Sequence, residues 1–438
     1  MDVSVFFGRH DELTTLTQWI IQDRCRLVTI LGMGGIGKTT LAVKLAQQIQ
    51  GEFEYLIWRS LRHAPPLVSI LTDLNELLTK ESQTVIPETV DCQISCLLKI
   101  LRRKRCLLIL DDWETVLSSG DIAGYYRQGY EGYGELLKRV GEEPHQSTLV
   151  FLSREKPIEL AELAGVTLPV RVLLLKGFPR QDAIKLLATK GFSETEKGLE
   201  ELIQLYRGHP TALKIVATTI KDLFNGNICQ FMQQSSLVIG DIFSHLLNEQ
   251  FARLSSLEEK IMYWLAIECQ PISLEQLKTN LGVGVSSSEL LAVLESLSRR
   301  CLIDKASLLL MEQEQTSVDS TALFTLQPVI MKYVTNLFVE KICQNIIEVI
   351  RTKSIEKLGL LRTHALVKQE SDDVQQCRQV RLILTRIQER LHLVMENTNA
   401  IKEQLQNLLS QLRGYPGRGN GYAEYNLQKL LRITETGW

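Results

Sequence analysis

The segment that most constrains this chain runs from Gly32 to Thr39 and reads Gly-Met-Gly-Gly-Ile-Gly-Lys-Thr. It matches the pattern G-x-x-x-x-G-K-[ST] at every fixed position. The apolar run Leu27–Leu31 precedes it, and a stretch with helical spacing, Leu41–Ile49, follows it. Glycines in such a loop let backbone N–H groups face inward, and the N-terminus of the following helix attracts anions. The sequence therefore predicts a phosphate-binding loop (P-loop) that holds a nucleoside diphosphate or triphosphate.

The positions of this motif have distinct expected roles. Lys38 should reach the β- and γ-phosphates and assist catalysis, and the Thr39 hydroxyl should ligate Mg²⁺. The residues of the loop expected to bind nucleotide are Gly32, Gly34, Gly35, Ile36, Gly37, Lys38, Thr39 and Thr40.

A second nucleotide element follows in Cys106–Asp112, an apolar run that ends in two carboxylates. P-loop enzymes place such a strand opposite the phosphate loop. We expect Asp111 to hold Mg²⁺, directly or through water, and Asp112 to orient or activate the attacking water as a catalytic residue. The alternative is that these aspartates only cap a helix or start a turn. The basic run Arg102–Arg105 just before the strand is either a solvated helix end or a nucleic-acid patch.

The first part of the chain alternates β-rich runs with helical stretches, which indicates βαβ units and a parallel sheet. The expected strands are Leu27–Leu31, Tyr55–Trp58, Cys106–Leu110 and Leu149–Leu152, with helices over Leu67–Leu78 and Gln93–Leu101. The pattern fades after about residue 165. The predicted fold is thus an α/β P-loop NTPase domain over residues 1–165.

The rest of the chain is predicted to be mainly helical. A helical subdomain is expected over 166–240, including Gln181–Thr189, Leu199–Tyr206 and Pro210–Phe224. Helices followed by short β-rich pieces, Cys301–Asp304 and Leu323–Leu326, favour a winged-helix domain over 241–335, with a polar loop at Glu312–Ser320. A helical connector is expected over 336–413, and the glycine-rich segment after it indicates a linker or tail over 414–438.

Composition narrows the choice of partners. The 438 residues carry 49 Lys and Arg against 51 Asp and Glu, a net charge of −2. This balance gives no general attraction to nucleic acid or to a membrane surface. No apolar run is long enough to cross a bilayer. The nine cysteines lack paired metal spacing and are expected to be reduced thiols, which favours a cytoplasmic protein.

The motifs together resemble the NB-ARC family of STAND P-loop ATPases, the nucleotide switches of plant disease-resistance proteins and of the apoptotic protease-activating factor. The resemblance covers about residues 5 to 335. It is specific because several motifs occur in the same order as in the family. They are Phe7–Arg9, Gly32–Ala42, Phe53–Arg59, Leu110–Trp113, Leu149–Arg154, Gly208–Leu213 and Phe324–Pro328. The run from Phe324 to Val334 looks like bacterial and especially cyanobacterial members, in which WD repeats commonly follow.

The resemblance implies roles for four further residues. Arg9 belongs to the entry motif that packs near adenine, and Arg154 is similar to the arginine that faces the terminal phosphate. Pro210 corresponds to the proline that packs on the base. Gln327 occupies the position of the family's ADP-sensing histidine, and its amide can donate a hydrogen bond but cannot titrate. For Arg9, Arg154 and Gln327, the alternative is an ordinary structural contact. His209 is expected to have a structural or helix-capping role, and Trp113 a packing role.

The resemblance implies an ADP/ATP-dependent signalling switch with slow ATP hydrolysis and self-association on activation. Two alternatives stay open, namely a winged-helix DNA-binding regulator and a continuously cycling mechanical ATPase. The main basic residues of the predicted winged helix are Arg299, Arg300 and Lys305, and this small cluster does not favour nucleic acid as a partner. The first motif lies close to Met1 and the chain ends soon after residue 422. Effector and sensor domains are therefore expected elsewhere, in a longer protein or in separate chains.

Overall fold

The computed structural model describes residues 3, 6–79, 89–234, 241–307, 322–369, 371–395, 398–414 and 421–436. The chain divides into two compact units, which are treated separately below. The first unit comprises residues 1–255 and 293–302, and the second comprises residues 256–292 and 303–438.

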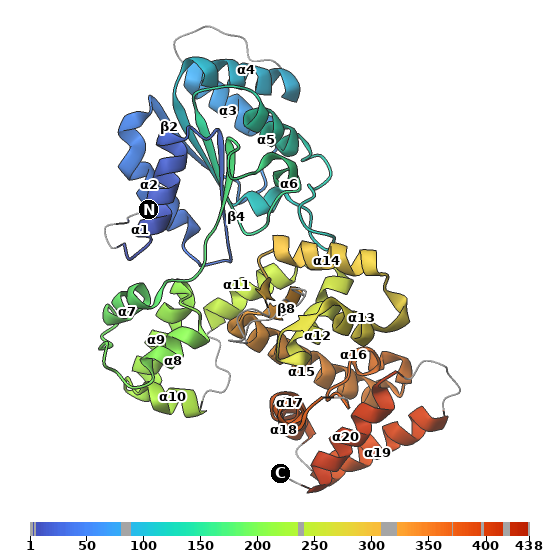
Figure 1. The fold of residues 1–438 in the computed structure, drawn as a ribbon. Coiled ribbons are helices and arrows are strands. Elements are labelled where there is room, and N and C mark those ends of the chain that lie inside the picture. Colours follow the sequence, from blue (N-terminus) through green and yellow to red (C-terminus); the bar gives the residue numbers. More distant parts are fainter. Residues whose placement is uncertain are drawn as a thin grey trace, which may run out of the picture. The chain divides into compact units, whose positions relative to one another are not determined.

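A sheet of five strands, in the order β2-β3-β4-β1-β5, forms the centre of the first unit (Figure 1). All of its strand pairs are parallel. The strands are β1 (Leu27–Leu31), β2 (Tyr55–Ser60), β3 (Cys106–Asp111), β4 (Thr148–Ser153) and β5 (Val170–Leu174). Helices connect successive strands, as parallel pairing requires. The predicted α/β P-loop fold is confirmed, and the four predicted strands lie where expected.

Helices cover both faces of this sheet. Helices α3 (Leu67–Thr79), α4 (Val90–Arg103) and α5 (Gly132–Glu142) contribute to one apolar cluster, and α1 (His10–Thr17) and α2 (Lys38–Ile49) contribute to the other. Every residue of β1, β3 and β4 is therefore buried. A strand covered on both faces is apolar throughout, which is why these strands appear in the sequence as continuous apolar runs.

The predicted domain boundary at residue 165 is wrong for this sheet. Strand β5 lies beyond it and pairs with β1, from Leu27 with Val170 to Leu31 with Leu174. It is an edge strand, and of its five residues only Val170 is buried. Arg171 also interrupts its apolar run, so the alternating pattern fades before the sheet is complete.

Short helices make up the rest of the first unit. They are α6 (Leu160–Leu163), α7 (Arg180–Ala188), α8 (Leu199–Leu205), α9 (Pro210–Phe224), α10 (Ile228–Gln234) and α11 (Asp241–Phe251). Helices lie close to the expected positions at 181–189 and 199–206, and α9 has the predicted bounds. Because α11 belongs to the first unit, the predicted boundary at residue 240 lies too early.

The second unit contains a small antiparallel sheet in the order β6-β8-β7. Along the chain its elements are α12 (Ser256–Glu268), β6 (Ile272–Ser273), α13 (Leu274–Leu281), the start of α14 (Ser287–Arg299), β7 (Ile303–Ser307) and β8 (Ala322–Leu326). This element order is the one that a winged helix has, and the winged-helix assignment stays a prediction. The predicted loop at Glu312–Ser320 lies outside the described residues.

Helices fill the remainder of the second unit, namely α15 (Pro328–Thr352), α16 (Leu360–Thr363), α17 (Asp373–Gln379), α18 (Thr385–Met395), α19 (Thr398–Gly414) and α20 (Ala423–Thr436). Helix α15 is continuous over 25 residues, so no boundary falls at residue 335. The prediction of a linker or tail is wrong for residues 423–436. They form α20, which packs on α19 through apolar residues at helical spacing such as Leu427 and Leu430. The glycine-rich residues 415–420 lie outside the described part.

Two general expectations can be compared with the structure. All nine cysteines are free thiols, as predicted. Within the described ranges, no helix has both the length and the apolar character needed to cross a lipid bilayer.

Candidate nucleotide-binding site

The P-loop connects β1 to α2 at the carboxyl edge of the parallel sheet. Gly37, with φ 102°, directly precedes the first helical residue, Lys38. Gly35 has φ 77°, and a Cβ atom there would lie 2.8 Å from Oγ1 of Thr211. Both glycines therefore satisfy a left-handed backbone conformation, and Gly35 additionally allows a close approach of helix α9. Residues 32–40 are brought together as the motif predicts.

The side chain of Lys38 is folded over the loop. Its Nζ atom donates hydrogen bonds to the carbonyl oxygens of Gly32 (2.7 Å) and Met33 (3.1 Å). Burial lowers the pKa of this ammonium group, and the nearby carboxylate of Glu114 opposes the shift. A bound phosphate would replace these carbonyl oxygens as the acceptor, so the lysine is already positioned at the loop.

Thr39 and Asp111 meet where the P-loop faces the end of β3. The Thr39 hydroxyl donates to Oδ2 of Asp111 at 2.9 Å, and the backbone N–H of Asp112 donates to Oδ1 at 2.9 Å. Burial, followed by the charge of Asp112, raises the pKa of Asp111 to about 6. These two oxygen-bearing side chains have the chemistry of a Mg²⁺ site, because Mg²⁺ takes hard oxygen ligands and completes its shell with phosphate and water.

Asp112 turns the chain away from the sheet. It adopts a left-handed conformation with φ 61°, and its Oδ2 accepts a hydrogen bond from the Ser60 hydroxyl at 3.0 Å. The adjacent Trp113 is completely buried and its ring contacts Tyr133 and Phe151. The expected packing role of Trp113 is confirmed.

The N-terminus of α9 lies against the P-loop. His209 caps this helix, since its Nδ1 accepts from the backbone N–H of Ala212 at 3.3 Å. The other ring nitrogen, Nε2, then carries the proton and donates to the carbonyl oxygen of Gly34 at 3.1 Å. The Thr211 hydroxyl donates to the carbonyl of Gly35 at 2.7 Å. Burial lowers the pKa of His209 to about 4, which keeps the ring neutral. The expected capping role of His209 is confirmed, and Pro210 is the first residue of the helix at this contact.

Arg154 follows β4 and reaches the P-loop. Its Nε lies 3.1 Å from Oε1 of Glu114, and its Nη1 lies 3.0 Å from Oε2 of Glu249. A Cβ atom at Gly34 would lie 3.3 Å from the Arg154 guanidinium carbon. The guanidinium is therefore held by two carboxylates beside the loop, and a contact with a terminal phosphate stays a prediction.

Arg9 is buried against the opposite end of the loop sequence. Its Nη2 donates to the carbonyl of Ile36 at 3.1 Å, and its Nη1 pairs with Glu12 at 2.7 Å. The guanidinium also lies over the Phe178 ring at 4.6 Å. Burial lowers the pKa of Arg9 despite the Glu12 partner. Arg9 therefore supports the P-loop backbone from the N-terminal side.

The sequence profile of the NB-ARC domain matches residues 9–124, which include Arg9, the P-loop and both aspartates. Residues 9–124 are thus similar to NB-ARC domains. This confirms the predicted resemblance to the NB-ARC family.

Known proteins are similar to this chain over different shares of its length. An uncharacterised WD repeat-containing protein of Nostoc sp. is 41% identical over 98% of the chain, and the chain spans 36% of that protein. The disease resistance protein UNI of Arabidopsis thaliana is 23% identical over 62% of the chain, which spans 28% of it. A crystal structure of a STAND protein with a tetratricopeptide repeat sensor, from Pyrococcus horikoshii, covers all of the chain at 17% identity with a TM-score of 0.37. The chain thus spans about a third of the length of its Nostoc relative.

Gln327 lies in the second unit, outside the matched NB-ARC segment. It precedes α15 as the N-cap residue, and its amide Nε2 donates to Oδ1 of Asp304 at 3.2 Å. This contact joins the start of α15 to β7. A contact of Gln327 with nucleotide stays a prediction.

Three residues of the NB-ARC site were missed in the sequence. Glu114 accepts a hydrogen bond from the backbone N–H of Arg154 and forms an ion pair with its guanidinium group. Glu249 forms a second ion pair with the same guanidinium, through Nη1. The Thr211 hydroxyl donates a hydrogen bond to the carbonyl oxygen of Gly35 in the P-loop. Glu114 follows Asp111 and Asp112 closely in the sequence, and this proximity could have predicted that it lies near the site. Glu249 lies in a helix far along the chain and had no such signal.

Proposed function

We propose that the chain is an ADP/ATP-dependent switch of the NB-ARC type that holds ADP at rest and exchanges it for ATP. The observation that carries this proposal is the direct contact between the P-loop and the N-terminus of α9, through His209 and Thr211. A nucleotide in the loop would touch both the sheet domain and the helical region. Ligands that contact two structural modules differently in their diphosphate and triphosphate forms can shift the balance between module arrangements.

Within this proposal, the P-loop residues have specific tasks. Lys38 would bind the β- and γ-phosphates. The phosphates would also be held by backbone or side-chain groups of the other loop residues, namely Gly32, Gly34, Gly35, Ile36, Gly37 and Thr40. Thr39 and Asp111 would hold Mg²⁺, which supplies charge neutralisation of the phosphates when it is bound. Asp112 would position the water that attacks the terminal phosphate, giving slow hydrolysis as a reset step.

The residues outside the loop would report the state of the nucleotide. Arg154 would exchange one of its carboxylate partners for the terminal phosphate of ATP, and Pro210 and Arg9 would lie near the base. Gln327 would donate its amide to the β-phosphate of ADP. The open form would self-associate and act through effector and sensor domains or proteins in the cytoplasm.

The first test identifies the nucleotide that the purified protein releases on denaturation. Tightly held ADP is expected, because a resting switch retains its diphosphate. Chromatography of the released nucleotide measures this directly. An empty site in protein purified with Mg²⁺ present would argue against a latched switch.

The second test is Lys38→Ala, with Lys44→Ala as the matched control on the same helix. Lys38→Ala should weaken nucleotide binding at least about tenfold, since a charge-assisted phosphate contact contributes roughly 1.5–3 kcal/mol. Lys44 lies over the Phe6 ring rather than in the loop, so its variant should bind normally. Isothermal titration with ADP and Mg²⁺ measures both. Equal affinity in the two variants would overturn the placement of the phosphates.

A further inference from the structure

A second concave site lies in the second unit, remote in sequence from the P-loop. This Arg362 pocket has a volume of about 360 Å³. It is lined by the C-terminal end of α13, by residues of α12 and by the segment around α16, with Lys260, Trp264, Arg362, His364 and Tyr422 among its lining residues. The volume falls in the range of small-molecule sites.

The charge of the Arg362 pocket is one-sided. Lys260 and Arg362 both line it, and no Asp or Glu does so among the residues that the structure describes. His364 adds no charge of its own, because burial lowers its pKa to about 4. A concave site with two cations and no lining carboxylate attracts anions.

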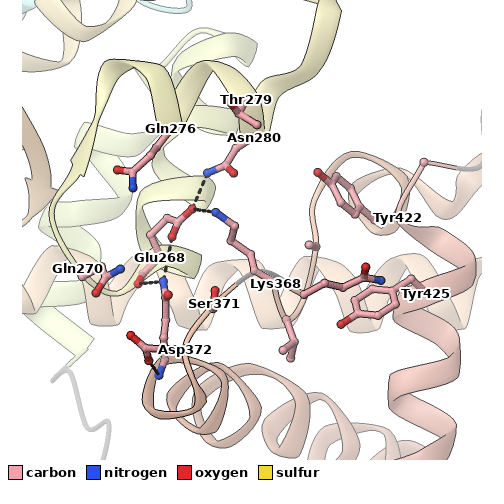
Figure 2. A pocket seen from close by; sticks show the side chains of 15 residues that line it. Glu268, Gln270, Gln276, Thr279, Asn280, Lys368, Ser371, Asp372, Tyr422 and Tyr425 are labelled. Carbon is pink, nitrogen blue, oxygen red and sulfur yellow. Dashed lines mark hydrogen bonds and ion pairs between the residues drawn. The ribbon is translucent and has the colours of Figure 1, made fainter.

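A neighbouring pocket shows how the same unit treats a paired cation. This Glu268 pocket, of about 700 Å³, shares Asn280 and Tyr422 with the Arg362 pocket. Figure 2 shows the ion pair between Lys368 and Glu268 in this pocket. The ammonium nitrogen of Lys368 lies 2.6 Å from Oε1 of Glu268. The cation there is already neutralised within the protein.

Arg362 has no such neutralisation. Its Nε and Nη2 atoms are shielded from solvent, and neither has a hydrogen-bond partner within the described part of the chain. Leaving buried guanidinium donors without acceptors is costly, since each loses its hydration without replacement. To satisfy both atoms, a ligand with two adjacent acceptor oxygens requires the guanidinium to turn its covered edge into the pocket; the fork can then bind a carboxylate or phosphate group in a bidentate manner.

The backbone that carries Arg362 is firmly held. The buried amide of Asn426 donates to the carbonyls of Leu361 and His364, at 2.8 Å each, and accepts from the N–H of Leu366 at 2.9 Å. The backbone N–H of Tyr422 donates to the carbonyl of Arg362 at 3.0 Å. These contacts fix the backbone from which the Arg362 side chain projects.

We propose that the Arg362 pocket binds a small anionic molecule through a carboxylate or phosphate group, with Arg362 as the bidentate anchor and Lys260 as a second cation at the site. The aromatic residues Trp264 and Tyr422 provide an apolar wall for the rest of the molecule. This ligand site is separate from the nucleotide site and does not rest on the proposed switch.

The test uses the full-length chain in a Lys38→Ala background, so that the P-loop does not contribute. Inorganic phosphate and acetate are titrated separately at constant ionic strength, with chloride as the reference anion, and thermal unfolding reports binding. The variants are Arg362→Gln, Arg362→Lys and, as control, Arg351→Gln. Arg351 is exposed and lies in α15 of the same unit, so its loss changes the net charge equally.

At least one of the two anions should stabilise the parent and the Arg351→Gln chain, and the one that does so identifies the chemistry. Arg362→Gln should bind it roughly tenfold or more weakly, and Arg362→Lys should be intermediate because it keeps the charge without the fork. Modification of arginines by phenylglyoxal, mapped by mass spectrometry, should be blocked by the anion at Arg362 and not at Arg351. Equal binding by Arg362→Gln and Arg351→Gln, or no binding of either anion by the parent, would overturn the proposal.

Discussion

Glu155 in the first unit and Glu268 in the second are equally buried, at 2% exposure each, but their partners differ in kind. Glu155 accepts from Nη1 of Arg300 at 2.7 Å, from Nη2 of Arg253 at 3.1 Å and from the N–H of Gly124 at 2.9 Å. Glu268 accepts from Nζ of Lys368 and from the amides of Asn280 and Gln375. Two cations therefore serve the first carboxylate, and one cation with two neutral amides serves the second.

The two carboxylates differ in how much unpaired charge stays buried when the carboxylate is removed. Arg300 is only 2% exposed, so without Glu155 its charge would stay buried beside a second arginine. Lys368 is 23% exposed and can turn toward water, and the amides near Glu268 carry no net charge. Removing one partner of a buried ion pair is far more costly than removing one partner of a neutral hydrogen bond. The first unit should therefore depend more strongly on its carboxylate.

The largest effect is expected for Glu155→Gln, which keeps the shape and removes the charge. We expect a loss of about 3–5 kcal/mol in the free energy of unfolding of the first unit, because two arginines lose their counter-ion. Hydrogen exchange under native conditions, followed on peptides of β3 and β4, measures it. The control Glu162→Gln changes an exposed carboxylate and should stay within about 0.5 kcal/mol of the parent.

A smaller effect is expected for Glu268→Gln in the second unit. The loss should be about 1–3 kcal/mol, the usual effect of disrupting hydrogen bonds to a buried carboxylate. Hydrogen exchange of peptides from α12 and α17 measures it, with peptides of β3 and β4 as the internal reference. A loss as large as that of Glu155→Gln would contradict the comparison between the two networks.

The smallest effect at neutral pH is expected for the buried histidines, one from each unit. Burial lowers the pKa of both His209 and His364 to about 4, below the unfolded value of 6.5. The folded chain therefore binds fewer protons than the unfolded chain, and stability is lost as pH falls from about 6.5 toward 4. His209→Asn should lower stability by about 1 kcal/mol at pH 7, because a helix cap is kept and one hydrogen bond is lost.

Acid titration separates the two units further. His364→Asn should remove acid sensitivity from the second unit, whereas His209→Asn should leave part of it in the first. The reason is His145, whose pKa is also lowered to about 4 by burial and which remains in the first unit. Unit-resolved hydrogen exchange at pH 5 and pH 7 measures the change. An unchanged pH dependence in both variants would show that these rings do not carry the acid response.

Much of the first unit could be predicted because its strands are buried on both faces. The run at Leu27–Leu31 is apolar except for Thr29, and the run at Cys106–Leu110 is apolar throughout. Each leads directly into residues with clear chemistry, so strands and site were identified together. Strand β5 was missed because it lies at the sheet edge and is mostly half-exposed. Helix α20 was also missed. Its apolar residues at helical spacing follow a glycine-rich segment, and that segment led to the prediction of a linker.

The supporting contacts of the site were less predictable than its motifs. Lys38, Thr39 and Asp111 follow from local patterns, whereas the bonds of Thr211 and Glu249 depend on how distant helices pack. The unpartnered donors of Arg362 could not be predicted either, because an arginine without an acceptor has no signature in sequence. Side chains whose role depends on tertiary contacts can be identified only from the three-dimensional structure.

The position of β1 between β4 and β5 has a consequence for folding during synthesis on the ribosome. The two neighbours of Leu27 are Leu149 and Val170, so β1 emerges more than a hundred residues before either partner. At a synthesis rate of about 5–20 residues per second, the strand that carries the P-loop waits on the order of ten seconds without its partners. During that interval an apolar strand and a glycine-rich loop are exposed together. Transiently exposed apolar surface and unpaired strand edges favour aggregation, and pauses in translation before residue 148 would lengthen that exposure.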